Sequence, residues 1–182
     1  MRAGITTRAM NPITASRRHY EDLAVGEKIP LGRTPVSKQM ILEFASEFDP
    51  LPFHLDEDAA KASLLGGLAA SGWQTAALTL KLLDEAFLNT IATMGGLGFT
   101  DLKWKRPVMV GDAITGTATI AALRRSNSHP ERGILTLELD VRNQKGEPVM
   151  SMSLANLVEA RDALPTPQPP DDVAHFDSGE KK

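Results

Sequence analysis

A long apolar helix limits what this chain can fold into. The stretch WQTAALTLKLLDEAFL, residues 73–88, has apolar side chains at helical spacing, and they cover almost the whole circumference. A helix that is apolar nearly all round is buried and does not lie on a surface. Other parts of the chain must therefore wrap around this helix, which is expected to begin at Gly72.

The second half of the chain supplies strands for that purpose. Residues 134–143 alternate between apolar and polar side chains, which is the period of a half-buried strand. A short edge strand is expected near residues 20–34, limited by Pro30. The other predicted strands lie at residues 98–104, 113–123 and 149–158. Helices followed by consecutive strands predict the α+β class with an antiparallel sheet.

The 182 residues are expected to form one domain with a full hydrophobic core. Residues 1–18 contain four arginines and no acidic side chain, and they are predicted to be a disordered leader, with a transit peptide as the alternative. Residues 161–182 are rich in proline and charge, which predicts a disordered tail. The folded domain is therefore expected at residues 19–160.

Composition excludes several classes of protein. The sequence has no cysteine, which rules out disulfides, thiolate metal ligands and a cysteine nucleophile. Its net charge of −3 gives no basic footprint for nucleic acid. No apolar run approaches the roughly 20 residues of a membrane helix, and the N-terminal segment lacks the apolar core of a secretory signal. We expect a cytoplasmic protein with neither a nucleic-acid nor a membrane partner.

The residues best suited to chemistry lie before the long helix. Asp49 and His54 are five positions apart in FDPLPFH, and Pro50 and Pro52 stiffen the segment between them. Ser37 is a good N-cap for a helix that would end at Asp49. An acid and a base on one rigid loop indicate acid/base chemistry.

Small residues follow this loop. Gly66 and Gly67 either satisfy special backbone angles or contact a ligand. Gly72 either allows close packing or offers its backbone N–H, with the helix dipole, to negative charge. Ser71 is expected to be the N-cap of the long helix, with a contact to a substrate as the alternative. Asp56 is expected to cap a further short helix.

These features resemble the MaoC-like dehydratase family, which includes (R)-specific enoyl-CoA hydratases. Asp49, His54 and Asp56 match the two aspartates and the histidine of the family motif. The pair Gly66-Gly67 and the later Gly72 match its glycines. The match extends to LKWKRPVMVGD, residues 102–112, which is similar to a strand-loop-strand segment of the family.

Three positions depart from the family motif. Phe48 stands where the family usually has glycine, Leu51 replaces its asparagine, and Ser71 replaces its histidine. The missing asparagine removes a polar side chain that would help to hold the loop.

The resemblance implies the hot-dog fold, in which an antiparallel sheet wraps around one long buried helix. It implies an enzyme that adds water across the C2=C3 bond of a 2-enoyl-CoA, or catalyses the reverse, without a metal or cofactor. Asp49 and His54 would be the catalytic residues, and the Gly72 N–H would hold the enolate oxygen. The substrate would contact Gly67, Ser71 and Gly72. A second copy would close the open edge of the sheet, giving at least a homodimer.

Two other functions remain open. A hot-dog thioesterase would use Asp84 or Glu85 as its carboxylate, although both lie near the far end of the long helix. A non-catalytic acyl-CoA-binding subunit is the second alternative, because Leu51 and Ser71 depart from the motif. Three basic residues either contact the phosphates of CoA or are simply solvated: Lys103, Lys105 and Arg106.

Overall fold

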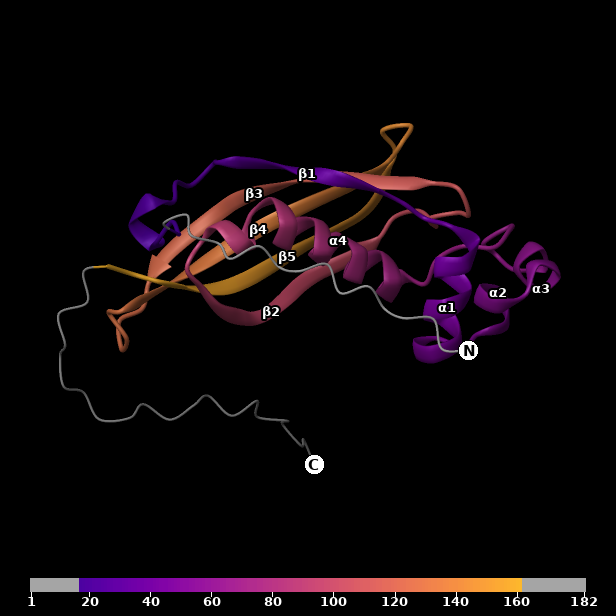
Figure 1. The fold of residues 1–182 in the computed structure, drawn as a ribbon, viewed down its shortest axis with the longest axis horizontal. Helices are drawn as coiled ribbons and strands as arrows, with labels where there is room; N and C mark the ends of the chain where they lie inside the picture. The colour runs from indigo at the N-terminus through magenta and orange to yellow at the C-terminus, as the bar shows by residue number, and fades with distance from the viewer. Residues whose placement is uncertain (1–16, 162–182) are drawn as a thin grey trace, which may run out of the picture.

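The structure, a computed structural model, describes residues 17–161. One strand and three short helices precede a long helix, and four strands follow it (Figure 1). The helical elements are η1 (Tyr20–Asp22), α1 (Lys38–Phe48), α2 (Pro52–Leu55), α3 (Glu57–Ala62), α4 (Gly72–Ala86) and η2 (Leu88–Thr90). The strands are β1 (Lys28–Pro35), β2 (Thr93–Trp104), β3 (Ala113–Arg125), β4 (Arg132–Asn143) and β5 (Pro148–Glu159).

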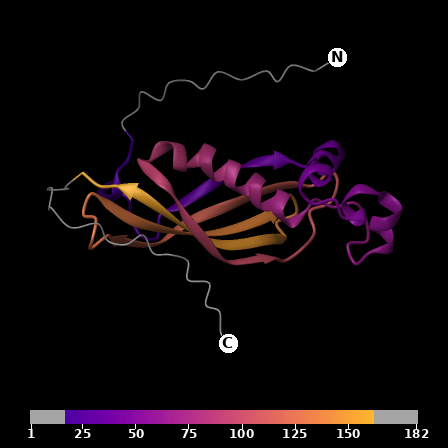
Figure 2. The ribbon, with the colours of Figure 1, turned by 90° about the horizontal axis from the view of Figure 1, so that it is seen from below.

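The five strands form one antiparallel sheet in the order β1-β3-β4-β5-β2. The long helix α4 lies along one face of this sheet, and the strands curve around it (Figure 2). The short helices α1, α2 and α3 gather at one end of the sheet, and η1 lies at the opposite end (Figure 1). This is the hot-dog arrangement, so the predicted fold class is confirmed. In residues 17–161, no helix is long and apolar enough to cross a membrane.

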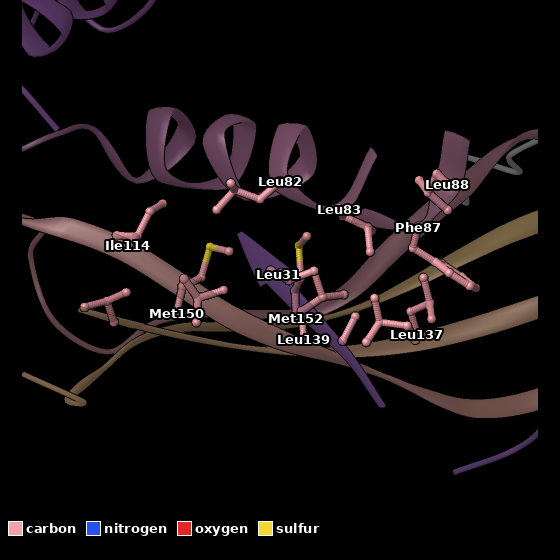
Figure 3. Packing of buried hydrophobic residues seen from close by; sticks show 14 of the residues in the cluster. Leu31, Leu82, Leu83, Phe87, Leu88, Ile114, Leu137, Leu139, Met150 and Met152 are labelled. Carbon is pink, nitrogen blue, oxygen red and sulfur yellow. The ribbon is translucent and has the colours of Figure 1, made fainter. Parts of the chain in front are cut away.

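The core lies between α4 and the concave face of the sheet. Leu82 and Leu83 point from the helix toward apolar side chains of the strands, and Phe87 follows directly after the helix (Figure 3). Leu83 is completely buried. Burial of such side chains is the main favourable term in folding. The strand residues labelled in this cluster are Leu31, Ile114, Leu137, Leu139, Met150 and Met152.

The long helix is buried on one side only, which corrects the prediction that it is buried all round. Trp73 is 53% exposed and Leu80 is 42% exposed. In contrast, Gln74, Thr75 and Thr79 are buried although they are polar. The hydroxyl of Thr79 donates to the Thr75 carbonyl at 2.8 Å, so it keeps a hydrogen bond inside the core. A single five-stranded sheet is too narrow to cover the whole circumference of the helix.

Two strands run further than predicted. β1 continues through Pro30, because β1 is an edge strand and a missing N–H on its outer side breaks no ladder. β2 begins at Thr93 instead of Gly98 and passes through a glycine-rich segment. Its pairing with β5 shows three register shifts, so the glycines form irregularities within the strand and do not end it.

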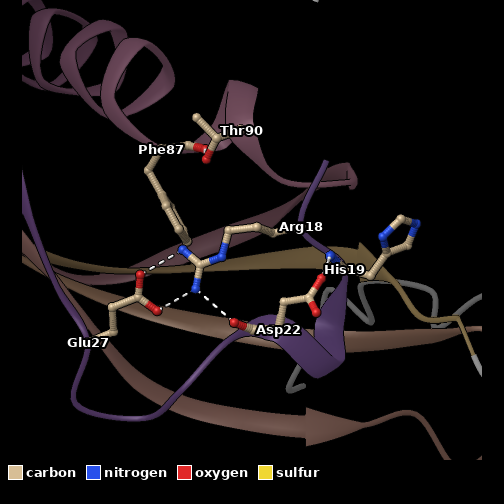
Figure 4. Close-up of polar contacts among 6 residues, drawn as sticks. All are labelled: Arg18, His19, Asp22, Glu27, Phe87 and Thr90. Atoms are coloured by element: carbon tan, nitrogen blue, oxygen red, sulfur yellow. Dashed lines mark hydrogen bonds and ion pairs between the residues drawn. The ribbon is translucent and has the colours of Figure 1, made fainter. Parts of the chain in front are cut away.

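Ion pairs tie the chain together at the η1 end of the sheet. Both terminal nitrogens of Arg18 donate to the Glu27 carboxylate at 2.7 Å, and one also donates to the Asp22 carbonyl (Figure 4). The same guanidinium lies 5.9 Å from the centre of the Phe87 ring. Arg161 forms an ion pair with Asp22. This pair, together with a hydrogen bond from the His19 N–H, lowers the pKa of the Asp22 carboxyl from 3.8 to about 2.

Three residues of the predicted leader and tail therefore belong to the described structure, namely 17, 18 and 161. Arg18 forms a bridge to Ile91 beside its ion pair, which the assignment of residues 1–18 to a leader did not anticipate. The other residues of both predicted segments lie outside the described range.

Replacing Arg18 with alanine is expected to lower the free energy of unfolding by about 1 kcal/mol at neutral pH, because a partly exposed pair and a ring contact are lost. The Arg18 hydrogen bond lowers the pKa of Glu27 below its usual 4.5 in the folded protein. This stabilisation is therefore present above about pH 4.5 and is lost as the pH falls through the lowered pKa. Urea unfolding of wild type and Arg18→Ala at pH 7 and pH 3 measures the difference, which should shrink at pH 3. Arg17→Ala removes a neighbouring exposed guanidinium and serves as the control; an equal loss in both variants would contradict the role of the pair.

Candidate active site

A cavity of about 380 Å³ lies where the short helices meet the start of α4. It contains the two residues that the sequence predicts as catalytic, Asp49 and His54. The walls are mostly apolar and combine residues far apart in the sequence. The other lining residues are Phe53, Leu65, Ala70, Ser71, Gly72, Trp73, Thr75, Trp104, Lys105, Arg106, Pro107 and Val108.

Asp49 lies at the C-cap of α1, as predicted. Its N–H donates to the Ala45 carbonyl, which ends the helix, and Ser37 caps the other end through the Met40 N–H. The apolar residues Ile41 and Ala45 anchor α1 in the protein interior. The position of the Asp49 carboxylate is therefore set by a packed helix.

His54 lies on a one-turn helix and not on the loop that the sequence analysis expected. Pro52 opens this helix, a position where its missing N–H breaks no hydrogen bond. The Leu51 N–H donates to the Asp49 carbonyl at 2.7 Å, and the His54 N–H donates to the Leu51 carbonyl at 2.9 Å. These backbone hydrogen bonds hold the segment together, although Leu51 has no polar side chain.

His54 is 6% exposed, and its imidazole has a defined orientation. Its Nδ1 lies 2.8 Å from the Ala69 carbonyl, which only accepts hydrogen bonds, so Nδ1 carries the hydrogen. In the neutral ring, Nε2 is then an acceptor. It faces Asp49 Oδ2 at 3.6 Å, which is too long for a direct hydrogen bond. Two acceptors at this separation suit a donor placed between them, such as water.

Ser71 links the acid to the long helix. Its Oγ accepts from the Trp73 N–H at 3.1 Å, so the predicted N-cap is confirmed. The same hydroxyl donates to Asp49 Oδ2 at 2.6 Å. This second contact could not be predicted from the sequence, since 22 residues separate the pair and nothing in the local pattern indicates it.

Gly72 is the first residue of α4, and its backbone N–H has no protein partner in the described part of the chain. Trp104 packs directly on this glycine, and a Cβ added to Gly72 would lie 2.5 Å from the indole. Close packing therefore requires a glycine here. The same residue also presents a helix N-terminal N–H beside the cavity.

The glycine pair before α4 lies outside the cavity lining. Gly66 has a φ of 72°, which favours glycine. A Cβ on Gly67 would lie 2.9 Å from the Met109 side chain. Backbone conformation therefore accounts for the glycine at position 66, and close packing accounts for the glycine at position 67. The substrate contact predicted for Gly67 gains no support from this geometry.

Two of the three basic candidates reach the cavity, while Lys103 lies elsewhere, near Asp101. Lys105 and Arg106 line its mouth. Asp84 and Glu85 do not line it. Burial, and then the neighbouring Glu85, raise the pKa of Asp84 above its usual value. Among residues 17–161, no three histidine or carboxylate side chains cluster to hold a metal ion.

The fold is a hot-dog fold, and its cavity brings an aspartate and a histidine side by side. A family model for the MaoC-like domain matches residues 22–141, and the chain belongs to this family. The uncharacterized protein YdeM of Bacillus subtilis is 31% identical over 140 residues, which cover 76% of this chain and 97% of that protein. An (R)-specific enoyl-CoA hydratase of Rhodospirillum rubrum is 28% identical over 110 residues, covering 58% of this chain and 71% of that enzyme. The solved structure of a MaoC-like dehydratase from Rhodospirillum rubrum has 43% identity and a TM-score of 0.73, covering 80% of this chain and 99% of that one.

Proposed function

We propose that this protein adds water across the C2=C3 bond of a 2-enoyl-CoA, or catalyses the reverse dehydration. The observation that carries the proposal is the pair of facing acceptors, Asp49 Oδ2 and His54 Nε2, 3.6 Å apart at the wall of a mostly apolar cavity. Membership of the MaoC-like family and the similarity to a relative named (R)-specific enoyl-CoA hydratase support it.

In the proposed reaction, one water donates its two hydrogens to Asp49 and His54. As its oxygen forms a bond to C3, one proton passes to the pair, and the π electrons of C2=C3 move toward the thioester oxygen. The Gly72 N–H donates to the resulting enolate oxygen, with support from the dipole of α4. The pair then returns a proton to C2 on the same face, which restores the thioester and leaves a 3-hydroxyacyl product.

Ser71 takes the role of a positioning residue in this proposal. Its hydroxyl donates to Oδ2 of Asp49 at 2.6 Å, so the carboxylate is restrained from rotating. Together with the backbone hydrogen bonds of Leu51, this contact replaces the support that the family's asparagine would give.

Ser71→Ala is expected to lower kcat by about one to two decades, because a hydrogen bond to a charged group is lost. It should also lower the free energy of unfolding by about 1 kcal/mol through loss of the helix cap. Ser37→Ala is the matched control, because Ser37 caps α1 in the same way without touching Asp49. Steady-state kinetics and melting curves of both variants test this. Equal kcat values in the two variants would remove Ser71 from the mechanism.

One assay separates the proposed hydratase from the alternatives. The purified protein is mixed with a trans-2-enoyl-CoA, and both loss of the conjugated double bond and release of free CoA thiol are followed. We expect the double bond to be lost with no thiol released, because the acid and base are proposed to act at C3. Thiol release with a persistent double bond would indicate a thioesterase. Saturable binding with neither signal would indicate a binding subunit.

We also propose that two copies associate through the exposed edge of β2. Within residues 17–161, this strand pairs only with β5, and no other described strand covers its outer edge. Met94 and Leu97 are each about half exposed along it. Exposed apolar edges favour pairing with another chain. The cytoplasmic location and the absence of any cofactor stay predictions from the sequence.

A further inference from the structure

Trp104 makes two specific contacts with the glycine that opens α4. Its indole Nε1–H donates to the Gly72 carbonyl at 2.9 Å. Its ring lies against the Gly72 Cα, at the place a side chain would occupy. Trp104 is the last residue of β2, so these contacts join the edge strand to the start of the long helix.

Glycine is the residue with the greatest backbone freedom, so an unrestrained Gly72 would not aim its N–H in one direction. The peptide group before it is held at its carbonyl, because the Ser71 oxygen accepts from the Thr75 N–H at 3.0 Å and from the Thr75 hydroxyl at 3.2 Å. The peptide group after it is held by Trp104. The N–H of Gly72 belongs to the first of these two peptide groups, and the two restraints together fix the φ and ψ angles of Gly72.

Trp104 also forms part of the cavity wall, and it is 47% exposed. Its ring lines the cavity and lies edge-on to Trp73, with ring centres 5.4 Å apart. The two indoles therefore form an aromatic wall beside Gly72.

We infer that Trp104 is a positioning residue, which restrains the backbone angles of Gly72 from its carbonyl side so that its N–H points to the enolate oxygen. This inference rests on the proposed function. Trp104 acts on the transition state through Gly72 and takes no part in proton transfer. Because a preorganised donor acts mainly where charge develops, its loss lowers kcat more than it weakens binding of the ground state.

The test compares Trp104→Phe with wild type. Phenylalanine keeps an aromatic ring on Gly72 but cannot donate to its carbonyl. We expect kcat to fall by about one decade, less than the two to three decades typical of removing such a donor outright. The affinity for butyryl-CoA, a saturated thioester that cannot react, should stay close to that of wild type by calorimetry.

Leu97→Ala is the control, because Leu97 lies on the same strand with 48% exposure and outside the cavity lining. Any effect that passes through β2 or through assembly of two copies appears in both variants. A kcat for Trp104→Phe equal to that of wild type, or an equal fall in both variants, would overturn the inference. A fall in butyryl-CoA affinity as large as the fall in kcat would also overturn it. Wild-type protein that fails to hydrate enoyl-CoA would instead refute the proposed function itself.

Discussion

Asp49→Asn is expected to lower kcat for hydration of a 2-enoyl-CoA by about two to four decades, the usual contribution of general acid/base catalysis. The amide has nearly the same shape as the carboxylate but is a far weaker base. His54→Ala should have an effect of similar size, because two groups that share one water act as a unit and their losses are not additive. The double variant should therefore be little worse than either single one.

Asp58→Asn provides the control for this experiment. Asp58 lies in the nearby helix α3, and its side chain is 95% exposed. This variant should have wild-type kinetics. Melting curves of all variants show whether each remains folded. Wild-type turnover in a folded Asp49→Asn or His54→Ala variant would remove that residue from the mechanism.

Leu83→Ala is expected to give the largest loss of stability, about 2–5 kcal/mol in the free energy of unfolding. Leu83 is completely buried between α4 and the sheet, so the change leaves a cavity that the surrounding strands cannot fill (Figure 3). Leu64→Ala removes the same atoms from a fully exposed side chain and should change stability by less than about 0.5 kcal/mol. Urea denaturation measures both. Similar losses in the two variants would show that the packing around α4 is not the main source of stability.

The side of α4 that faces away from the sheet is exposed in the described structure. Trp73 and Leu80 are exposed because the sheet covers only one side of the helix. The apolar composition of this helix, which predicted complete burial, is instead consistent with a surface that a second copy covers. The sequence pattern records which side chains are apolar, but it does not state whether the same chain or another one covers them.

The local pattern of the sequence was sufficient to predict most elements. Ser37 and Asp56 are N-caps because their side chains accept hydrogen bonds from N–H groups two or three residues ahead. The alternation of residues 134–143 gave β4 nearly its observed limits. These features depend on residues that are close in the sequence, which is why the sequence alone is enough to predict them.

The catalytic candidates were predicted in part from the sequence, and in part they depend on the tertiary structure. Asp49 and His54 were identified from their spacing and from the resemblance to a family, and the structure places them in one cavity. Their separation of 3.6 Å depends on the short helix α2, which the proline-rich segment did not reveal. A one-turn helix has too few residues to show a period.

Tertiary structure alone decided the contacts that complete the candidate site. Ser71 reaches Asp49 across 22 residues, and Trp104 reaches Gly72 across 32. The sequence predicted a cap at Ser71 and a strand ending at Trp104, since both follow from local pattern. Which carboxylate the cap would face and which glycine the indole would cover depended on how α1 and β2 pack against α4. Packing joins residues with no relation in sequence, so these two contacts became visible only in the folded chain.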